Sequence, residues 1–180
     1  LAEAGPSIER FLDSGVIELG AKLGPINWQF MATKKFDPSD FEAFVKLLPA
    51  SHAGQALRHA VEVRHASFRD PAFIEIVRSR GVAAIVAADG QFPQIADATA
   101  PFVYALIMGT REDEPLGYSP AALDRWVERA RTWAAGGVPA DLEQVGPPAP
   151  AEPRDVFLYV ISGHKVRNPQ AAMALIERLA

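Results

Sequence analysis

The stretch VEVRH, residues 61–65, contains the pattern that decides the fold. Its valines alternate with a carboxylate and a guanidinium, and this period of two predicts a β-strand. Alternation places the valines and His65 on one face of the strand, and Glu62 with Arg64 on the other. Two charges on a covered face are tolerated as a pair, so we expect Glu62 and Arg64 to contact one another.

Four other stretches read as strands, because short apolar or β-branched runs lie between turn residues. They are residues 24–30, 82–88, 102–108 and 155–161. Between the strands, apolar residues recur with helical spacing; the helices are expected over residues 6–19, 37–48, 72–80, 120–135 and 170–179.

Strands that alternate with helices and are mainly apolar indicate an α/β protein with a parallel sheet. A barrel and a doubly wound sheet both satisfy this pattern. A complete eight-unit barrel takes about 250 residues. The chain has 180 residues and about five expected strands, so it would form an open sheet or an incomplete barrel.

The composition is that of one globular domain, residues 1–180, with 49% hydrophobic and 22% charged residues. Five prolines between residues 136 and 154 predict a loop insertion there. A net charge of -4 argues against a nucleic-acid partner. The absence of cysteine excludes disulfides and thiol chemistry and is compatible with a cytoplasmic setting.

No apolar run is long enough for a membrane helix, so we expect no membrane association. The sequence contains no zinc signature, Walker motif or dinucleotide-binding glycine motif, and we expect no metal site. It identifies no cofactor, and it leaves assembly into a homo-oligomer open.

Two segments carry a resemblance to a known family. The first is Gly24-Pro25-Ile26-Asn27-Trp28-Gln29, which follows the pattern Gly-Pro-x-x-Trp-Gln, and the second is Glu62-Val63-Arg64-His65. Together with Asp89 and the run Ala100-Pro101-Phe102-Val103-Tyr104, they resemble the YecE-like family, or domain of unknown function 72. The resemblance implies a TIM-type barrel of parallel strands and no established activity. It also implies that about three further strand and helix units precede this stretch in family members. We therefore expect a partial barrel, its C-terminal two thirds.

The chain departs from the family where members usually read Tyr-x-Arg-x-His-Gly. Here the sequence is Tyr104-Ala105-Leu106-Ile107-Met108-Gly109, so leucine and methionine replace the arginine and the histidine. The substitution points to a divergent subgroup with its own ligand or to a degenerate site.

Polar residues also follow the other strands, at the end where barrel enzymes build their sites. They are Gln29, Asp89, Ser162, His164 and Lys165. With Arg64, they predict one pocket for a small anionic ligand, a phosphate or a carboxylate. Trp28 either stacks on that ligand or packs in the core. If the pocket is catalytic, in a hydrolase-like reaction, Glu62 or Asp89 serves as general base and His65 or His164 transfers the proton.

Three interpretations remain open at this point. The first is an enzyme acting on a small anion. The second is a non-catalytic binding or regulatory module, which Leu106 and Met108 favour. The third is nucleic-acid processing, which only the cationic residues suggest. The Glu62–Arg64 pair is also explained by structure alone, as an ion pair that satisfies itself.

Overall fold

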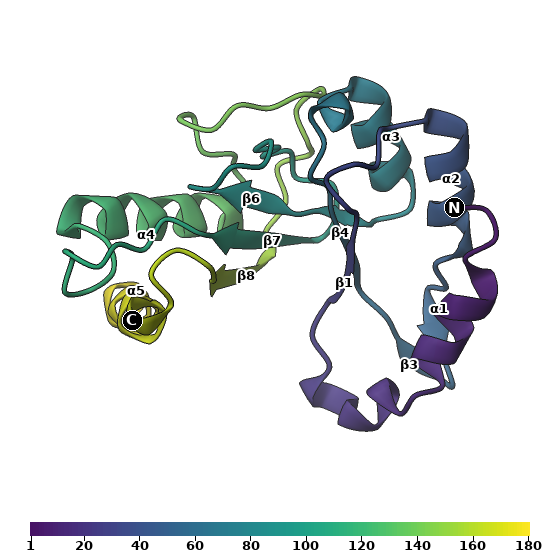
Figure 1. Cartoon of the computed structure of the whole chain (residues 1–180), viewed down its shortest axis with the longest axis horizontal. Helices are drawn as coiled ribbons and strands as arrows, with labels where there is room; N and C mark the ends of the chain where they lie inside the picture. Colours follow the sequence, from purple (N-terminus) through teal and green to yellow (C-terminus); the bar gives the residue numbers. More distant parts are fainter.

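The computed structural model describes residues 1–180, and its elements follow the expected alternation (Figure 1). The strands of its parallel sheets are β1 (Ile26–Gln29), β4 (His59–Glu62), β5 (Ala83–Ala84), β6 (Val86–Ala88), β7 (Phe102–Ile107) and β8 (Asp155–Val160). One sheet has the order β1-β4-β5 and the other the order β6-β7-β8, and all neighbours are parallel. The predicted α/β class with parallel strands is confirmed.

The two sheets adjoin through one residue. Ile85 alone separates β5 from β6, and its N–H donates to the carbonyl of Val61 at 2.9 Å. The strands therefore follow one another in space in the order in which they occur in the chain. β1 and β8 are each paired on one side only, and no ladder between them closes a barrel.

The helices are α1 (Gly5–Leu12), α2 (Pro38–Leu47), α3 (Pro71–Ser79), α4 (Pro120–Ala134) and α5 (Asn168–Leu179). The middle three begin in the same way, with proline in the first turn and a polar side chain just before it. Asp37 accepts from the N–H of Asp40 at 2.9 Å, Asp70 from that of Ala72 at 2.8 Å, and Ser119 from that of Ala122 at 3.3 Å. These local signals explain why the three helices begin where the sequence predicts.

Several boundaries differ from the prediction. The helix expected over residues 6–19 ends at Leu12, because Gly15 adopts a left-handed conformation (φ 95°) and a 3₁₀ segment, η1 (Val16–Lys22), follows. A small hairpin of β2 (Ser51–His52) and β3 (Gln55–Ala56) was not anticipated. Two short 3₁₀ turns complete the structure, η2 (Ala66–Phe68) and η3 (Lys165–Arg167). Residues 136–154 contain no helix or strand.

Two hydrophobic clusters lie between the strands and the helices. The first is built around phenylalanine rings whose centroids lie 5.1 to 6.4 Å apart: Phe30, Phe36, Phe41, Phe44, Phe68 and Phe73. It lies between β1, β4 and β5 and helices α1 to α3. The second contains the buried Trp126 and Trp133 of α4 and the outward residues of β6 to β8. The helix-covered side is here called the outer face.

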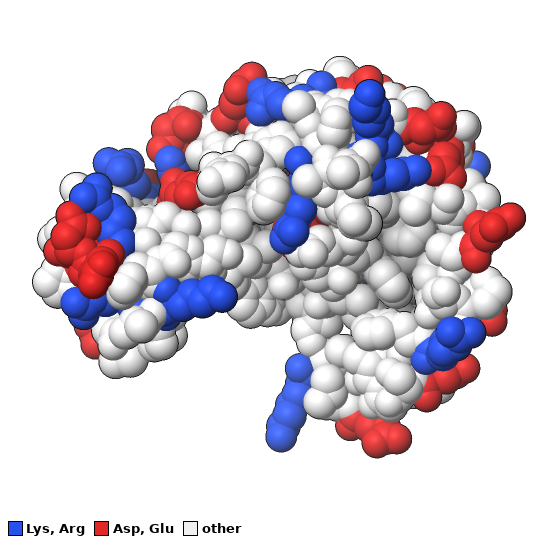
Figure 2. All heavy atoms as spheres, viewed as in Figure 1, with Lys and Arg blue, Asp and Glu red and all other residues white.

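The opposite, inner face of the strands carries a smaller apolar cluster. Its buried members are Ala60, Ala83, Ile85, Phe102 and Leu106. Figure 2 shows the molecule hollowed between the part formed by α4 and α5 and the part formed by α1 and η1, with few charged atoms on the visible walls. No helix combines the length and apolar character needed to cross a membrane.

Candidate functional site

Glu62 and Arg64 form an ion pair at the C-terminal end of β4. The Nε and Nη2 atoms of Arg64 lie 2.7 and 2.6 Å from Glu62 Oε1. The side chain of Glu62 is 2% exposed and that of Arg64 is 27% exposed. The expected pair is therefore present, with its acidic member buried and its basic member open to solvent.

The second oxygen of Glu62 is occupied from the neighbouring strand. Oε2 accepts from Asn27 Nδ2 at 3.2 Å and from Gln29 Nε2 at 2.9 Å. Parallel pairing sets this geometry, because Gln29 lies opposite Glu62 in the β1–β4 ladder. Both oxygens are thus engaged, and the carboxylate is a fixed acceptor rather than a free base.

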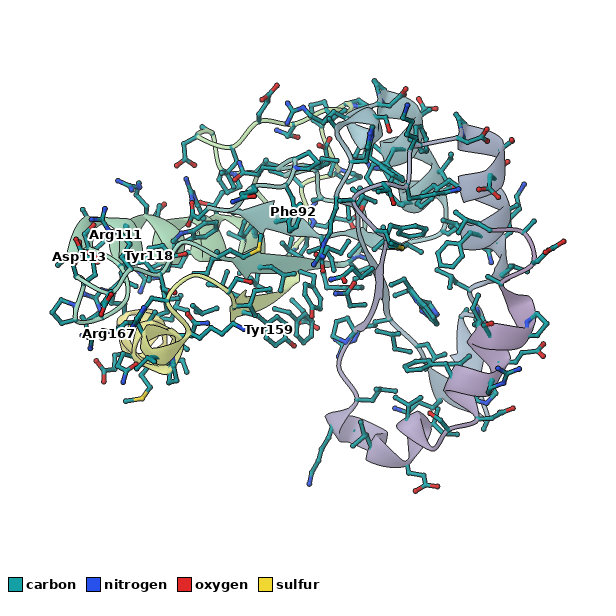
Figure 3. The ribbon with its side chains drawn as sticks, viewed as in Figure 1. Phe92, Arg111, Asp113, Tyr118, Tyr159 and Arg167 are labelled. Carbon is teal, nitrogen blue, oxygen red and sulfur yellow. The ribbon has the colours of Figure 1, made fainter.

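Arg64 is held on a second side by an aromatic ring. Phe92, in the loop that follows β6, lies with its ring centroid 4.5 Å from the guanidinium carbon (Figure 3). Arginine stacks well on aromatic faces. Nη1 makes no hydrogen bond within the chain, so one edge of an oriented guanidinium remains available.

Two tyrosines extend the polar part of the inner face. The rings of Tyr104 on β7 and Tyr159 on β8 have centroids 5.0 Å apart, and Tyr159 is 40% exposed beside the hollow (Figure 3). Burial raises the pKa of Tyr104, and the charges of Tyr159 and Glu62 add to this shift. Its hydroxyl is therefore a hydrogen-bond donor at neutral pH. The sequence reasoning missed Asn27, Phe92 and both tyrosines, although period-two alternation in β7 and β8 was a usable signal for the tyrosines.

Asp89 is engaged elsewhere. It follows β6 in a left-handed backbone conformation (φ 57°), and its Oδ2 accepts from Trp126 Nε1 of α4 at 3.0 Å. Tyr118 lies beside it, with its hydroxyl accepting from the N–H of Gly109 at 2.7 Å, and burial raises the pKa of that hydroxyl. Asp89 thus belongs to a network toward α4 and not to the Glu62 group.

Trp28 lies on the outer face of β1, and His65 lies beyond the end of β4. His65 Nδ1 accepts from the N–H of Ser67 at 3.1 Å and so closes the turn that begins η2. Trp28 packs edge-on against Phe11 and Phe44, and its Nε1 donates to His59 Nδ1 at 3.0 Å. Trp28 thus packs against the core, one of the two alternatives given for it, and neither residue forms a hydrogen bond with Glu62 or Arg64.

The residues after β8 form a separate group. The N–H of His164 donates to the carbonyl of Thr110 at 2.8 Å, and Thr110 Oγ1 donates to Asn168 Oδ1 at 2.6 Å. Strands β6 and β7 lie between β4 and β8, and buried Leu106 and Met108 occupy β7 and its end. The single polar pocket expected from the strand ends is therefore interrupted by apolar side chains.

Of the predicted site residues, the structure brings together Glu62, Arg64 and Gln29. It leaves apart from them Trp28, His65, Asp89, Ser162, His164 and Lys165. No three histidine, aspartate or glutamate side chains lie close enough together to hold a metal ion.

Comparisons with known proteins agree with this architecture. A family model described as "Protein of unknown function DUF72" matches residues 1–180. Among solved structures, a DUF72 family protein from Thermotoga maritima is similar, with a TM-score of 0.65 and 16% identity. The match covers 97% of this chain and 64% of that protein, so the chain spans less than two thirds of its length. At this identity the likeness concerns the fold alone. Comparison with curated proteins gives no match.

Proposed function

The chain belongs to the DUF72 family of proteins of unknown function. We propose that it binds a small anionic ligand through Arg64. The ligand class is a phosphate or carboxylate compound. The observation that carries the proposal is the oriented guanidinium of Arg64 at the C-terminal end of β4, 27% exposed and with Nη1 unused.

Orientation is what makes Arg64 suited to this role. Glu62 holds the Nε and Nη2 edge, and Phe92 covers one face of the guanidinium plane. Because the Arg64 side chain is already ordered, a ligand oxygen that accepts from its remaining N–H groups pays little conformational entropy on binding. The guanidinium is charged, so this hydrogen bond is stronger than one between neutral groups. Tyr104, whose pKa is raised in part by the charge of Glu62, provides a nearby hydroxyl for the rest of a polar ligand.

We further propose that the sheet is part of a TIM-type barrel. The strands follow one another in chain order without reversal, and the helices cover one face, as in such barrels. Barrel proteins build their sites at the C-terminal ends of the strands, which is where Gln29 and Arg64 lie.

A binding role without catalysis is favoured over an enzyme. Glu62 is buried and has no free lone-pair direction for a substrate proton, since four donor atoms surround its two oxygens. An enzymatic role is the second candidate, in which the exposed carboxylate of Asp89, just after β6, would serve as general base. Turnover of a bound phosphate or carboxylate compound by the purified protein would favour that candidate.

Thermal stabilisation by a panel of phosphorylated metabolites and carboxylates tests the proposal, because a ligand of the native state raises the melting temperature. A compound that stabilises the protein should lose its effect in Arg64→Ala. The matched control is Arg58→Ala, since Arg58 lies at the other end of the same face, paired with Asp155 at 3.2 Å. Equal loss in both variants would refute a specific role for Arg64.

A further inference from the structure

A cavity lies at the N-terminal ends of the strands, opposite the end where Arg64 lies. It has a volume of about 270 Å³ and is bounded by the end of α3, the loop before β7 and the proline-rich segment before β8. Its polar lining comes from Arg78, Thr99, Glu152 and Arg154. The proposed Arg64 site shares none of these residues.

Arg154 is buried without a carboxylate partner. It is 8% exposed, and its guanidinium donates only to main-chain carbonyls, those of Pro150 and Gly137. No acidic oxygen lies within 4 Å of its nitrogens, in contrast to the arginines at positions 58, 64, 69, 111, 129 and 178.

Arg78, on the same cavity wall, is half-buried and also lacks a carboxylate partner. Its Nη2 donates to the carbonyls of Ala98 at 3.2 Å and Pro147 at 3.1 Å, and it forms no ion pair. Its Nε is buried and has no hydrogen-bond partner. Two guanidinium groups therefore line one small cavity with no acid bound to either.

This arrangement is costly unless something neutralises it. Arginine keeps its charge in proteins, and a buried charge needs a counter-charge or a full set of hydrogen bonds. Burial lowers the pKa of Arg154, and Arg78 contributes to the lowering, whereas Glu152 opposes it. Glu152 is exposed and forms no ion pair with either arginine.

We propose that this cavity binds a small dianion of the inorganic phosphate or phosphomonoester class between Arg78 and Arg154. Such an anion supplies the negative charge that neither guanidinium finds within the chain, and its oxygens accept from N–H groups of the two arginines that line the cavity. The volume is just below the range of about 300–1,000 Å³ found for drug-sized ligands, which limits the occupant to a small compound.

A purely structural role for the two arginines explains less. Their bonds to carbonyls do hold the proline-rich segment against α3 and α4. That role leaves the absent counter-charge without explanation. It also predicts no effect from Glu152, whose exposed side chain holds nothing in place.

Inorganic phosphate, titrated at constant ionic strength into ¹⁵N-labelled protein, tests the proposal. The amide signals of Gly81, Thr99 and Glu152 should shift and saturate together. Arg78→Gln should weaken this binding by about tenfold or more, because one charge-assisted contact is lost. The matched control, Arg129→Gln, removes an arginine that pairs with Asp141 at 2.8 Å outside the cavity, and it should change nothing.

Glu152→Gln distinguishes the binding role from the structural one even if the arginine variants fold poorly. Removing the one acid of the lining should tighten phosphate binding by about threefold, because a nearby like charge is removed. Unchanged or weaker binding in Glu152→Gln would overturn the proposal, as would the absence of saturating shifts in the wild-type protein. Arg64→Ala should leave these shifts intact, so this site and the Arg64 site fail or succeed separately.

Discussion

The arginines at the two ends of the strands differ in whether they have a carboxylate partner. At the C-terminal end, Arg64 is bonded to buried Glu62, and the pair neutralises itself. At the N-terminal end, Arg78 and Arg154 bond only to carbonyls. Arg64 is thus neutralised whether or not a ligand is bound, whereas Arg78 and Arg154 would gain a counter-charge only from the anion proposed above.

The largest expected effect on stability follows from removing the carboxylate of Glu62, the counter-charge of Arg64. Glu62→Ala leaves Arg64, Asn27 and Gln29 without their common acceptor, and it should lower the free energy of unfolding by about 3 kcal/mol. Urea denaturation measures this loss. Glu42→Ala, which breaks an exposed pair with Lys46 at 2.8 Å, should cost less than about 0.5 kcal/mol. Similar costs for both would show that the Glu62 pair does not stabilise the fold.

A neutral polar contact at the N-terminal end should have a smaller effect. Buried Thr99 donates to the carbonyl of Val82 and accepts from the N–H of Ala84, both at 2.8 Å. Thr99→Val keeps the shape but removes both bonds, and it should lower the free energy of unfolding by about 1–3 kcal/mol. Denaturation of Thr33→Val, at an exposed position, provides the control. A cost below that of the control would contradict the prediction.

Stabilisation of the protein by phosphate distinguishes the two ends of the strands. Phosphate at ten times its dissociation constant should raise the free energy of unfolding by about 1.4 kcal/mol through mass action. The gain should persist in Arg64→Ala and disappear in Arg154→Met, when denaturation is repeated with and without phosphate. The reverse outcome would place the phosphate site at the C-terminal end.

The smallest expected effect is a pH dependence from His59, at the start of β4. Burial lowers the pKa of His59, and its hydrogen bond to the carbonyl of Pro49 only partly opposes this. The unfolded chain therefore binds a proton more readily than the folded protein, and stability falls as the pH falls below about 6.5. Unfolding of wild type and His59→Asn between pH 5 and 7.5 should give a shallower decline in the variant. Parallel curves would assign the decline to other groups.

Local signals in the sequence predicted much of the fold. The pairs Asp37-Pro38, Asp70-Pro71 and Ser119-Pro120 fixed three helix starts, and alternation placed Glu62 and Arg64 on one face. The β2–β3 hairpin was not predicted, because strands of two residues are too short to show an alternating pattern.

Contacts between distant segments were beyond the sequence reasoning. Tyr104 meets Tyr159 only through the register of β7 with β8, in which Leu106 lies opposite Tyr159. The cavity of Arg78 and Arg154 requires three segments that no motif connects. The sequence showed that Leu106 and Met108 replace polar residues of the family pattern. That these apolar side chains separate the polar ends of the other strands followed only from the strand order.

The sequential strand order also has a consequence for how the chain acquires its structure. Each strand joins an edge formed by the strand before it in the chain, so none must wait for a partner that has not yet been synthesised. As the ribosome releases the chain from its N-terminus, β4 finds β1 already present, and the phenylalanine cluster can close over them before β8 is made. Pairing between successive strands keeps the sequence separation between partners lower than pairing of the first strand with the last would, which lowers the entropic cost of closing each connection.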